Sequence, residues 1–311
     1  MKTRKLGKTD VHLSEIALGT WGISSGAYGP VDPQDFARVV ERALELEVTT
    51  FDMAPLWGAG EGERLVAKSV NDKRDKAQYV TRAGLEVVEG DLRKKYDRDA
   101  LVRACESSLE RLSTDRIDVW LLHNPDEEAL RRDEVKEVVA KLKKDGKIRA
   151  WGASVSDPEA ARLAIGAGAD AVCVVHNLLA GDDLADLATD LAESDVGLLA
   201  RSPLAYGLLT GYWSEAQWFP KADHRSRRWT PDALRQRVRQ MNSLRFLVHD
   251  KVESLASAAL RYVLSNDRVT SALVGARTVL HIALAARASD PPYLPEADLE
   301  KLPQVLAATG A

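Results

Sequence analysis

The sequence predicts an α/β fold, namely a (β/α)8 TIM barrel with an N-terminal β-hairpin and a C-terminal helix. About eight short apolar stretches, each followed by a stretch with helical spacing, run from Ile16 to Val274. Eight such units are the number that closes a barrel. No G-x-G-x-x-G follows the first strand, although an open dinucleotide-binding sheet requires it there. The 311 residues are therefore expected to form a single domain, 1–311.

The strands are placed from their apolar runs and from the turns that end them. Residues 3–6 and 11–16 flank the turn signal Gly-Lys-Thr-Asp and predict the hairpin. The barrel strands are expected at residues 16–18, 49–52, 78–81, 117–123, 148–154, 171–176, 197–201 and 271–274.

Apolar residues at helical spacing predict the helices between these strands. They are expected at residues 35–46, 61–70, 99–112, 133–144, 158–167, 184–193, 231–266, 278–288 and 296–308. Residues 212–230 break the pattern, because aromatic residues lie there among lysine, histidine and arginine with no clear period. We expect this segment to act as a substrate lid or to pack its aromatic side chains under a loop.

Composition excludes several classes of protein. Hydrophobic residues make up 45% of the chain and charged residues 29%, which is ordinary for a globular protein. A net charge of −4 gives no electrostatic footprint for nucleic acid or for an anionic membrane. Cys105 and Cys173 are the two cysteines, which predicts no disulfide framework and no metal site. No signal peptide or membrane span is expected, so the sequence predicts a cytoplasmic protein.

Polar side chains end six of the predicted strands. A charged group at the end of a buried strand costs free energy unless a counter-ion pairs with it or it takes part in binding or catalysis. The active site of a barrel lies at the carboxyl ends of its strands. Each residue alone is equally well explained as a polar cap at the start of a loop. Neighbouring strands, however, would bring the first three within side-chain reach. The six residues are Asp52, Arg82, His123, Ser154, Asn177 and Arg201.

A second signal follows the last predicted strand. Gly275-Ala276-Arg277-Thr278 is a glycine turn that opens a helix, with an arginine beside it. Such a turn can bind an anion, and barrel phosphate sites usually lie after the last strands. The alternative is an ordinary strand-to-helix turn.

These features resemble the aldo-keto reductase superfamily over nearly the whole chain. The resemblance rests on the hairpin and on five short motifs. It implies NADPH bound without a Rossmann fold, and a carbonyl reduced by an Asp–Tyr–Lys–His tetrad. The motifs are Ala-Leu-Gly-Thr-Trp at 17–21, Phe51-Asp52-x-Ala54-x-x-x-Gly58, Leu-Leu-His at 121–123, Ser-Pro-Leu at 202–204 and Val-Gly-Ala-Arg at 274–277.

The resemblance assigns the four tetrad positions to Asp52, Trp57, Arg82 and His123, and two of them depart from the family. Trp57 stands in place of the tyrosine that protonates the carbonyl oxygen. An indole N–H can donate a hydrogen bond but cannot release its proton near neutral pH. Arg82 stands in place of the lysine and stays charged, so it can still pair with Asp52 and stabilise an oxyanion. The sequence therefore predicts a poor conventional reductase whose tetrad acid is missing.

The resemblance also implies contacts to the cofactor. Gly275 and Arg277 match the motif that binds the adenine-side phosphate. At the nicotinamide end, Cys173 replaces a glutamine, and Arg201 replaces the aromatic residue that stacks on the ring. The implied cofactor-binding residues are Ser154, Asn177, Arg201, Ser202, Leu204, Gly275 and Arg277.

Three hypotheses about function remain open from the sequence. The first is an NAD(P)H-dependent oxidoreductase with His123, Tyr28 or Tyr206 as a substitute acid. The second is a redox-neutral enzyme for an anionic substrate, which would use Arg82, Arg201 and the neighbouring histidine and carboxylate. The third is a non-catalytic binding or regulatory protein on the same scaffold. The expected partner is a small molecule, and the sequence fixes neither this substrate nor the oligomeric state.

Overall fold

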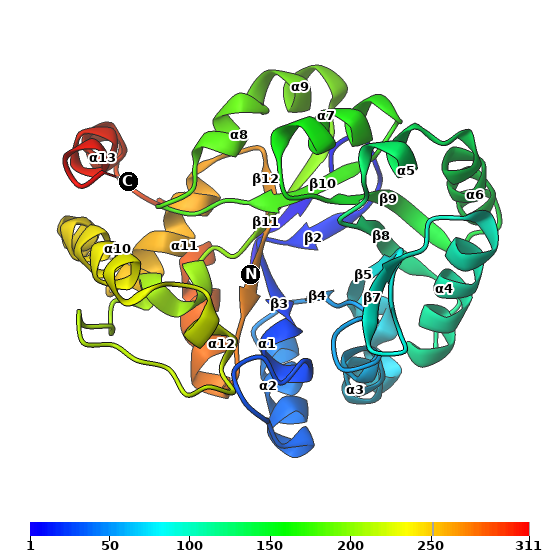
Figure 1. Ribbon diagram of the computed structural model, residues 1–311, viewed down its shortest axis with the longest axis horizontal. Helices are drawn as coiled ribbons and strands as arrows, with labels where there is room; N and C mark the ends of the chain where they lie inside the picture. The colour runs from blue at the N-terminus through cyan, green and yellow to red at the C-terminus, as the bar shows by residue number, and fades with distance from the viewer. Residues whose placement is uncertain (251, 311) are drawn as a thin grey trace.

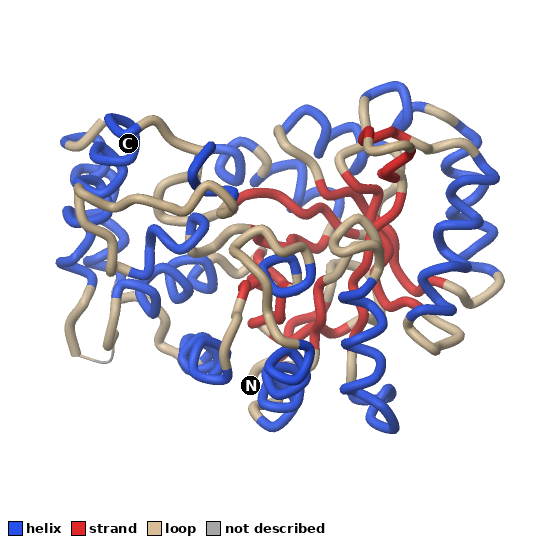
Figure 2. The backbone as a smooth tube through the Cα atoms, turned by 60° about the horizontal axis from the view of Figure 1, so that its bottom comes forward, coloured by secondary structure: helices blue, strands red, loops and turns tan. Residues whose placement is uncertain are grey.

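The computed structural model describes residues 1–250 and 252–310. Within them, parallel strands close into a barrel in the order β10-β11-β12-β3-β4-β5-β8-β9, as Figures 1 and 2 show. The predicted fold class is confirmed. The barrel strands are β3 (Ile16–Gly19), β4 (Thr50–Asp52), β5 (Gln78–Ala83), β8 (Ile117–His123), β9 (Ile148–Ser154), β10 (Ala171–Val175), β11 (Gly197–Arg201) and β12 (Val269–Gly275).

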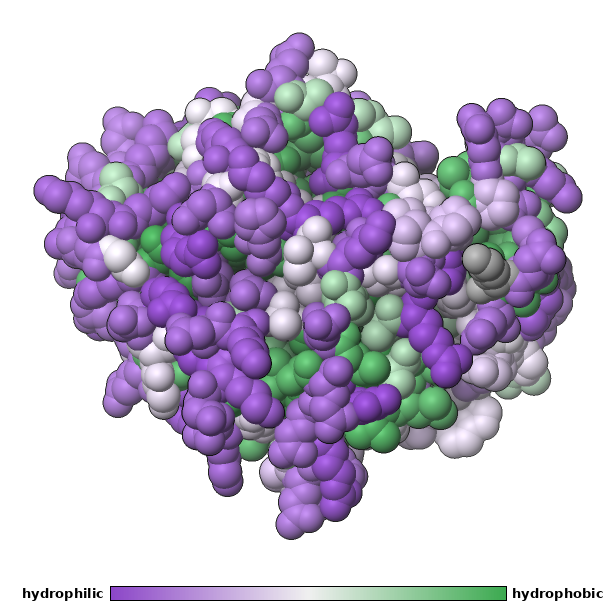
Figure 3. Space-filling model, turned by 180° about the vertical axis from the view of Figure 1, so that it is seen from behind, coloured by the Kyte–Doolittle hydropathy of each residue, from purple (hydrophilic) through white to green (hydrophobic). Residues whose placement is uncertain are grey.

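Helices cover the outside of this barrel. Aspartates at their N-caps accept backbone N–H bonds, as Asp97 does before α4 and Asp157 before α7. Seen from behind, the surface is mostly hydrophilic, with a hydrophobic area in its lower half (Figure 3). These helices are α2 (Pro33–Glu45), α3 (Glu61–Val70), α4 (Arg98–Arg111), α5 (Glu127–Arg131), α6 (Asp133–Lys144), α7 (Pro158–Gly166), α8 (Asp182–Asp186), α9 (Ala188–Ser194), α11 (Leu255–Ser265) and α12 (Val279–Ala286).

Two further helices, α10 (Pro231–Ser243) and α13 (Glu296–Ala308), lie to one side of the barrel beyond α11 (Figure 1). They share a second apolar cluster with α11, in which Val238 and Leu302 are buried. Short helical turns complete the chain. These are α1 (Trp21–Ser24), η1 (Asn71–Lys76), η2 (Ala205–Thr210), η3 (His224–Arg227), η4 (Leu244–Leu247) and η5 (Arg287–Ser289).

The N-terminal hairpin closes one end of the barrel. β1 (Thr3–Lys5) pairs antiparallel with β2 (His12–Ser14), as predicted. Leu6 and Leu13 are fully buried in the same apolar cluster as the inward-facing barrel residues. Leu6 approaches Gly197 so closely that a Cβ there would lie 2.3 Å from the Leu6 Cδ1 atom. The plugged end leaves the carboxyl ends of the strands as the open face of the barrel.

A second hairpin, which the sequence analysis did not predict, follows β5 at this open face. β6 (Leu85–Val88) and β7 (Asp91–Lys94) pair antiparallel. Glu89 and Gly90 form the turn with φ angles of 54° and 89°, the left-handed geometry that a two-residue hairpin turn favours.

No described helix has both the length and the apolar character needed to cross a membrane.

Candidate active site

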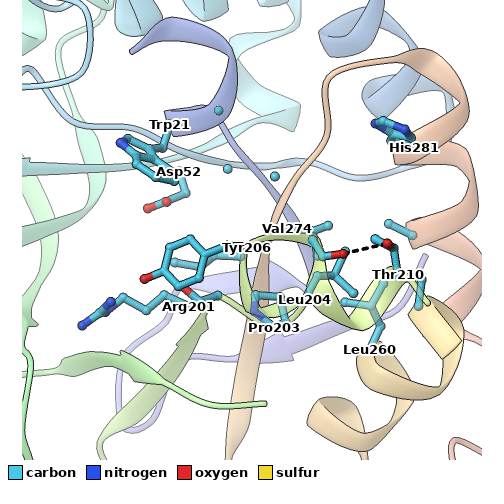
Figure 4. A pocket seen from close by; sticks show the side chains of 18 of the residues that line it. Trp21, Asp52, Arg201, Pro203, Leu204, Tyr206, Thr210, Leu260, Val274 and His281 are labelled. Carbon is cyan, nitrogen blue, oxygen red and sulfur yellow. Dashed lines mark hydrogen bonds between the residues drawn. The ribbon is translucent and has the colours of Figure 1, made fainter. Parts of the chain in front are cut away.

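Strand alternation brings the polar side chains to one cavity. On β5, Val80 lies in the barrel interior and Arg82 follows it at the open end, while Thr81 points outward and donates to Glu63 on α3. The cavity at this end has a volume of about 1300 Å³, and Figure 4 shows part of its lining. Predicted residues that line it are Asp52, Trp57, Arg82, His123, Ser154, Arg201, Ser202, Leu204, Gly275 and Arg277.

An ion pair forms the floor of the cavity. The Arg82 Nη1 atom donates to the Asp52 carboxylate at 2.5 Å and to the Met53 carbonyl at 2.8 Å. Its Nη2 atom lies 3.7 Å from the Cys173 sulfur. Asp52 and Arg82 are only 4% and 2% exposed. Burial raises the pKa of the Asp52 carboxyl, and the Arg82 guanidinium opposes that shift. Each charge therefore depends on the other.

Trp57 and His123 lie beside this pair. The Arg82 guanidinium lies 5.0 Å from the Trp57 ring centre, and the rings of Trp57 and His123 meet edge to face at 6.2 Å. The Tyr96 hydroxyl donates to the His123 carbonyl at 2.6 Å. Burial, together with the charges of Arg82 and Arg201, lowers the pKa of His123 to about 3. At neutral pH the imidazole is therefore neutral and can donate a hydrogen bond.

Arg201 carries a charge that the described residues leave without a counter-ion within 4 Å. Its Nη2 atom donates to the Val155 carbonyl at 3.0 Å, and its buried Nε atom has no partner. Asn177, predicted to touch the cofactor, does not line the cavity. Its amide donates to the Ser202 carbonyl at 3.1 Å and accepts from the Leu179 amide. Asn177 therefore supports the loop after β11.

The turn after β12 forms part of the rim. The Arg277 guanidinium donates to the carbonyls of Tyr28, Gly29 and Pro30 at 2.8, 3.3 and 3.2 Å. Its Nε atom is buried and has no partner. Nothing lies within 4 Å of where a Cβ of Gly275 would be. The arginine thus fastens the loop that follows α1, and the glycine leaves the backbone of the turn open.

The segment 212–230 packs partly inward at the rim. The His224 amide donates to the Ala27 carbonyl at 2.9 Å. The His224 ring lies 4.7 Å from the rings of both Trp21 and Tyr28. Arg225, held by Asp223 through two nitrogen atoms, lies 4.7 Å from the Tyr28 ring. Part of this segment therefore covers the cavity.

Comparison with known proteins identifies the family. The sequence profile of the Aldo/keto reductase family matches residues 15–307. The chain belongs to this family. It is 28% identical over 283 residues to "Aldo-keto reductase YhdN" of Bacillus subtilis (strain 168), covering 89% of this chain and 85% of that protein. It is 29% identical over 297 residues to "L-glyceraldehyde 3-phosphate reductase" of Escherichia coli (strain K12), covering 89% and 84%.

Solved structures agree with this assignment. The structure of the glycerol dehydrogenase AKR11B4 from Gluconobacter oxydans matches with a TM-score of 0.87 and 27% identity, covering 99% of this chain and 95% of that one. The resemblance found in the sequence motifs is therefore confirmed at the level of the family.

Some residues of this site could not be found from the sequence. Trp21 borders the cavity; the sequence analysis placed it in a family motif but gave it no role in the site. Cys173, which the resemblance places where the family has a glutamine, is fully buried and contacts the Arg82 guanidinium. Tyr96 holds the backbone of His123, and Gly84 makes room for it, because a Cβ on Gly84 would lie 1.9 Å from the Tyr96 Cε1 atom.

Proposed function

We propose that the protein is an NADPH-dependent oxidoreductase that reduces an aldehyde or ketone at an atypical active site. In it, Trp57 and Arg82 replace the tyrosine and lysine of the family tetrad. One observation carries the proposal: a single cavity joins the Asp52–Arg82 pair on the floor to the Arg277 turn on the rim. The similarity to two bacterial reductases and to the glycerol dehydrogenase from Gluconobacter oxydans also supports oxidoreductase chemistry.

The charges of the cavity suit a polyanionic cofactor. Among the described residues that line it there are six arginines but three carboxylates. Arg277 has a buried N–H without a partner, and the turn at Gly275 is open. NADPH would be held by this turn, by Ser202 and Leu204, and by Ser154 and Arg201 at the strand ends. When bound, it supplies the hydride for the carbonyl carbon.

The floor residues would bind and polarise the carbonyl. The neutral His123 ring and the Trp57 indole can each donate a hydrogen bond to the carbonyl oxygen. The buried Arg82 cation stabilises negative charge that develops on this oxygen, and the Asp52 carboxylate fixes the orientation of Arg82. Preorganised donors of this kind account for about 10²- to 10³-fold in rate per donor in comparable sites.

A redox-neutral reaction on an anionic substrate is the second candidate, and Arg201 favours it. Its guanidinium lines the cavity with a buried N–H free and no carboxylate within 4 Å among the described residues. A small anionic substrate would neutralise this charge. Activity that survives complete removal of nicotinamide cofactors would distinguish this candidate from the first.

Cofactor titration tests the proposed function. NADPH and NADH are added to purified protein while the fluorescence of its seven tryptophans is followed, and ultrafiltration gives the stoichiometry. We expect NADPH to bind at micromolar affinity. Arg277→Met should weaken the binding of NADPH more than that of NADH, because the 2′-phosphate on the adenine ribose is present only in NADPH.

Arg268→Met is the matched control, since Arg268 is exposed and lies on the turn before β12. It should leave both affinities unchanged. Absence of binding by either cofactor would overturn the proposed function and direct the search to anionic ligands.

A further inference from the structure

Among the described residues, the positions that the resemblance assigns to the tetrad, Asp52, Trp57, Arg82 and His123, include no phenol. The Trp57 indole holds its N–H, and the guanidinium groups of Arg82 and Arg201 remain charged. The pKa of His123 is lowered to about 3, so its imidazole is neutral near pH 7. A reduced carbonyl nevertheless needs a proton on its oxygen.

Among the described residues that line the cavity, three tyrosines, Tyr28, Tyr206 and Tyr212, carry a phenol hydroxyl. Tyr212 is 86% exposed. Burial raises the pKa of Tyr28 to about 12, and its ring is enclosed by Trp21, His224 and Arg225. Tyr206 lines the cavity, and Figure 4 shows it between Asp52 and Arg201, with its hydroxyl on the same side as the Asp52 carboxylate. Tyr206 is thus a cavity-lining tyrosine that this view shows near Asp52 and Arg201.

The backbone holds Tyr206 in this place at a cost. Tyr206 has a φ of 61°, and Ser202 and Ala205 have φ angles of 56° and 46°. Left-handed conformations are unfavourable for residues other than glycine, and they cluster at functional sites. A hydrogen bond from the Thr210 hydroxyl to the Gly207 carbonyl, 2.7 Å long and dashed in Figure 4, fixes the turn that follows.

A cation lies directly over the Tyr206 ring. The Arg228 guanidinium carbon is 3.5 Å from the ring centre. The other groups around this ring are Trp21, His224 and Trp229. The guanidinium therefore makes a close cation–π contact with the face of the Tyr206 ring.

We propose that Tyr206 is the acid that protonates the carbonyl oxygen, with Arg228 stabilising the tyrosinate. The inference rests on the proposed function. A hydride supplied by bound NADPH, which would be oxidised to NADP⁺, forms the new C–H bond as the C=O π bond opens. The Tyr206 O–H bond breaks, its proton forms the O–H bond of the alcohol, and its electron pair stays on the phenolate. Water then reprotonates the tyrosinate after the alcohol leaves.

The test is Tyr206→Phe, assayed in single turnover with NADPH and a panel of aldehydes and ketones. We expect the reduction rate to fall by about 10²- to 10⁴-fold, the range attributed to general acid catalysis, while the NADPH dissociation constant stays within about twofold. The solvent deuterium isotope effect of the wild-type protein should disappear, because the proton no longer comes from a positioned hydroxyl.

Two further variants keep the inference falsifiable. Arg228→Met should slow the step by a few-fold to about thirtyfold, in line with the strength of a cation–π contact. Tyr212→Phe should have no effect. Equal reduction rates for wild type and Tyr206→Phe would overturn the role of Tyr206 as the acid and leave the proposed function standing. A wild-type protein that binds NADPH but reduces no carbonyl would overturn the proposed function and the inference with it.

Discussion

The floor and the rim of the cavity are built by different means. On the floor, Asp52 and Arg82 extend from neighbouring barrel strands and pair in a buried site. On the rim, loops distant in sequence meet through aromatic edges and arginines, as His224 meets Tyr28. The positions on the floor that the resemblance assigns to the tetrad include a buried ion pair, an indole and an imidazole, but no phenol. The rim holds tyrosine hydroxyls and Arg277. In the mechanism that we propose, chemistry which the family places on the floor is divided between the two regions.

The largest expected effect is on the floor. Arg82→Met leaves the Asp52 carboxylate buried without a counter-ion, so unfolding free energy should fall by about 3–5 kcal/mol. Denaturant titration measures this loss. The double variant Asp52→Asn, Arg82→Met removes both charges and should recover part of the stability. If the double variant is as unstable as Arg82→Met, the two charges are not coupled as described.

A second effect on the floor depends on pH. The folded protein holds the pKa of His123 at about 3, below its ordinary value of 6.5, so the unfolded chain binds this proton first on acidification. Stability should therefore fall as pH falls from 6.5 toward 3, by about 1.4 kcal/mol per pH unit for this one group. His123→Gln should remove the part of this pH dependence of stability that is due to His123.

The matched variant for this slope is His176→Gln. Burial lowers the pKa of His176 to about 4, so its contribution should be confined to a narrower range of pH. Denaturant titrations at several pH values compare the two. An unchanged slope in His123→Gln would show that the imidazole is already protonated in the folded protein or is accessible to water.

The rim should respond locally and with a smaller change in stability. Arg277→Met removes the donors to the carbonyls of Tyr28, Gly29 and Pro30, at a cost of about 1–3 kcal/mol. Hydrogen exchange should accelerate in residues 26–30 and at His224, whose amide bonds to Ala27. Acceleration spread over the barrel strands would contradict the division between rim and floor.

The smallest effect is expected on the outer face of the rim. Trp218 is 73% exposed, so Trp218→Ala should change unfolding free energy by less than about 0.5 kcal/mol. Trp229 faces inward and contacts Tyr206 and Trp213. The matched variant Trp229→Ala should therefore lower the unfolding free energy by more than Trp218→Ala does. Similar losses for the two would mean that the segment 212–230 is not oriented as described.

The sequence predicted the floor better than the rim. Alternation along a strand decides which side chains enter the barrel, so Asp52, Arg82 and His123 could be placed together from their positions at strand ends. Arg277 was predicted to bind phosphate, whereas its guanidinium also bonds the Tyr28 carbonyl, 249 positions away. No local pattern encodes a contact of that range.

Two other differences between the predicted and the observed structure have separate causes. The β6–β7 hairpin has only Gly90 as a turn signal, and the sequence of β7, Asp-Leu-Arg-Lys, is mostly polar and exposed throughout, so no apolar alternation marked it as a strand. Asn177 was predicted to bind the cofactor, but its amide bonds the Ser202 carbonyl. The direction of a side chain at a strand end depends on the neighbouring loop, which the sequence does not reveal.

Isotope transfer tests the central claim most directly. NADPH carrying deuterium at the transferable nicotinamide C4 position is mixed with excess protein and a panel of aldehydes and ketones, and the alcohols are analysed by mass spectrometry. The account predicts that deuterium appears on the carbinol carbon of at least one product, with one NADP⁺ formed per alcohol. Bound NADPH that stays reduced while no labelled alcohol forms would contradict it.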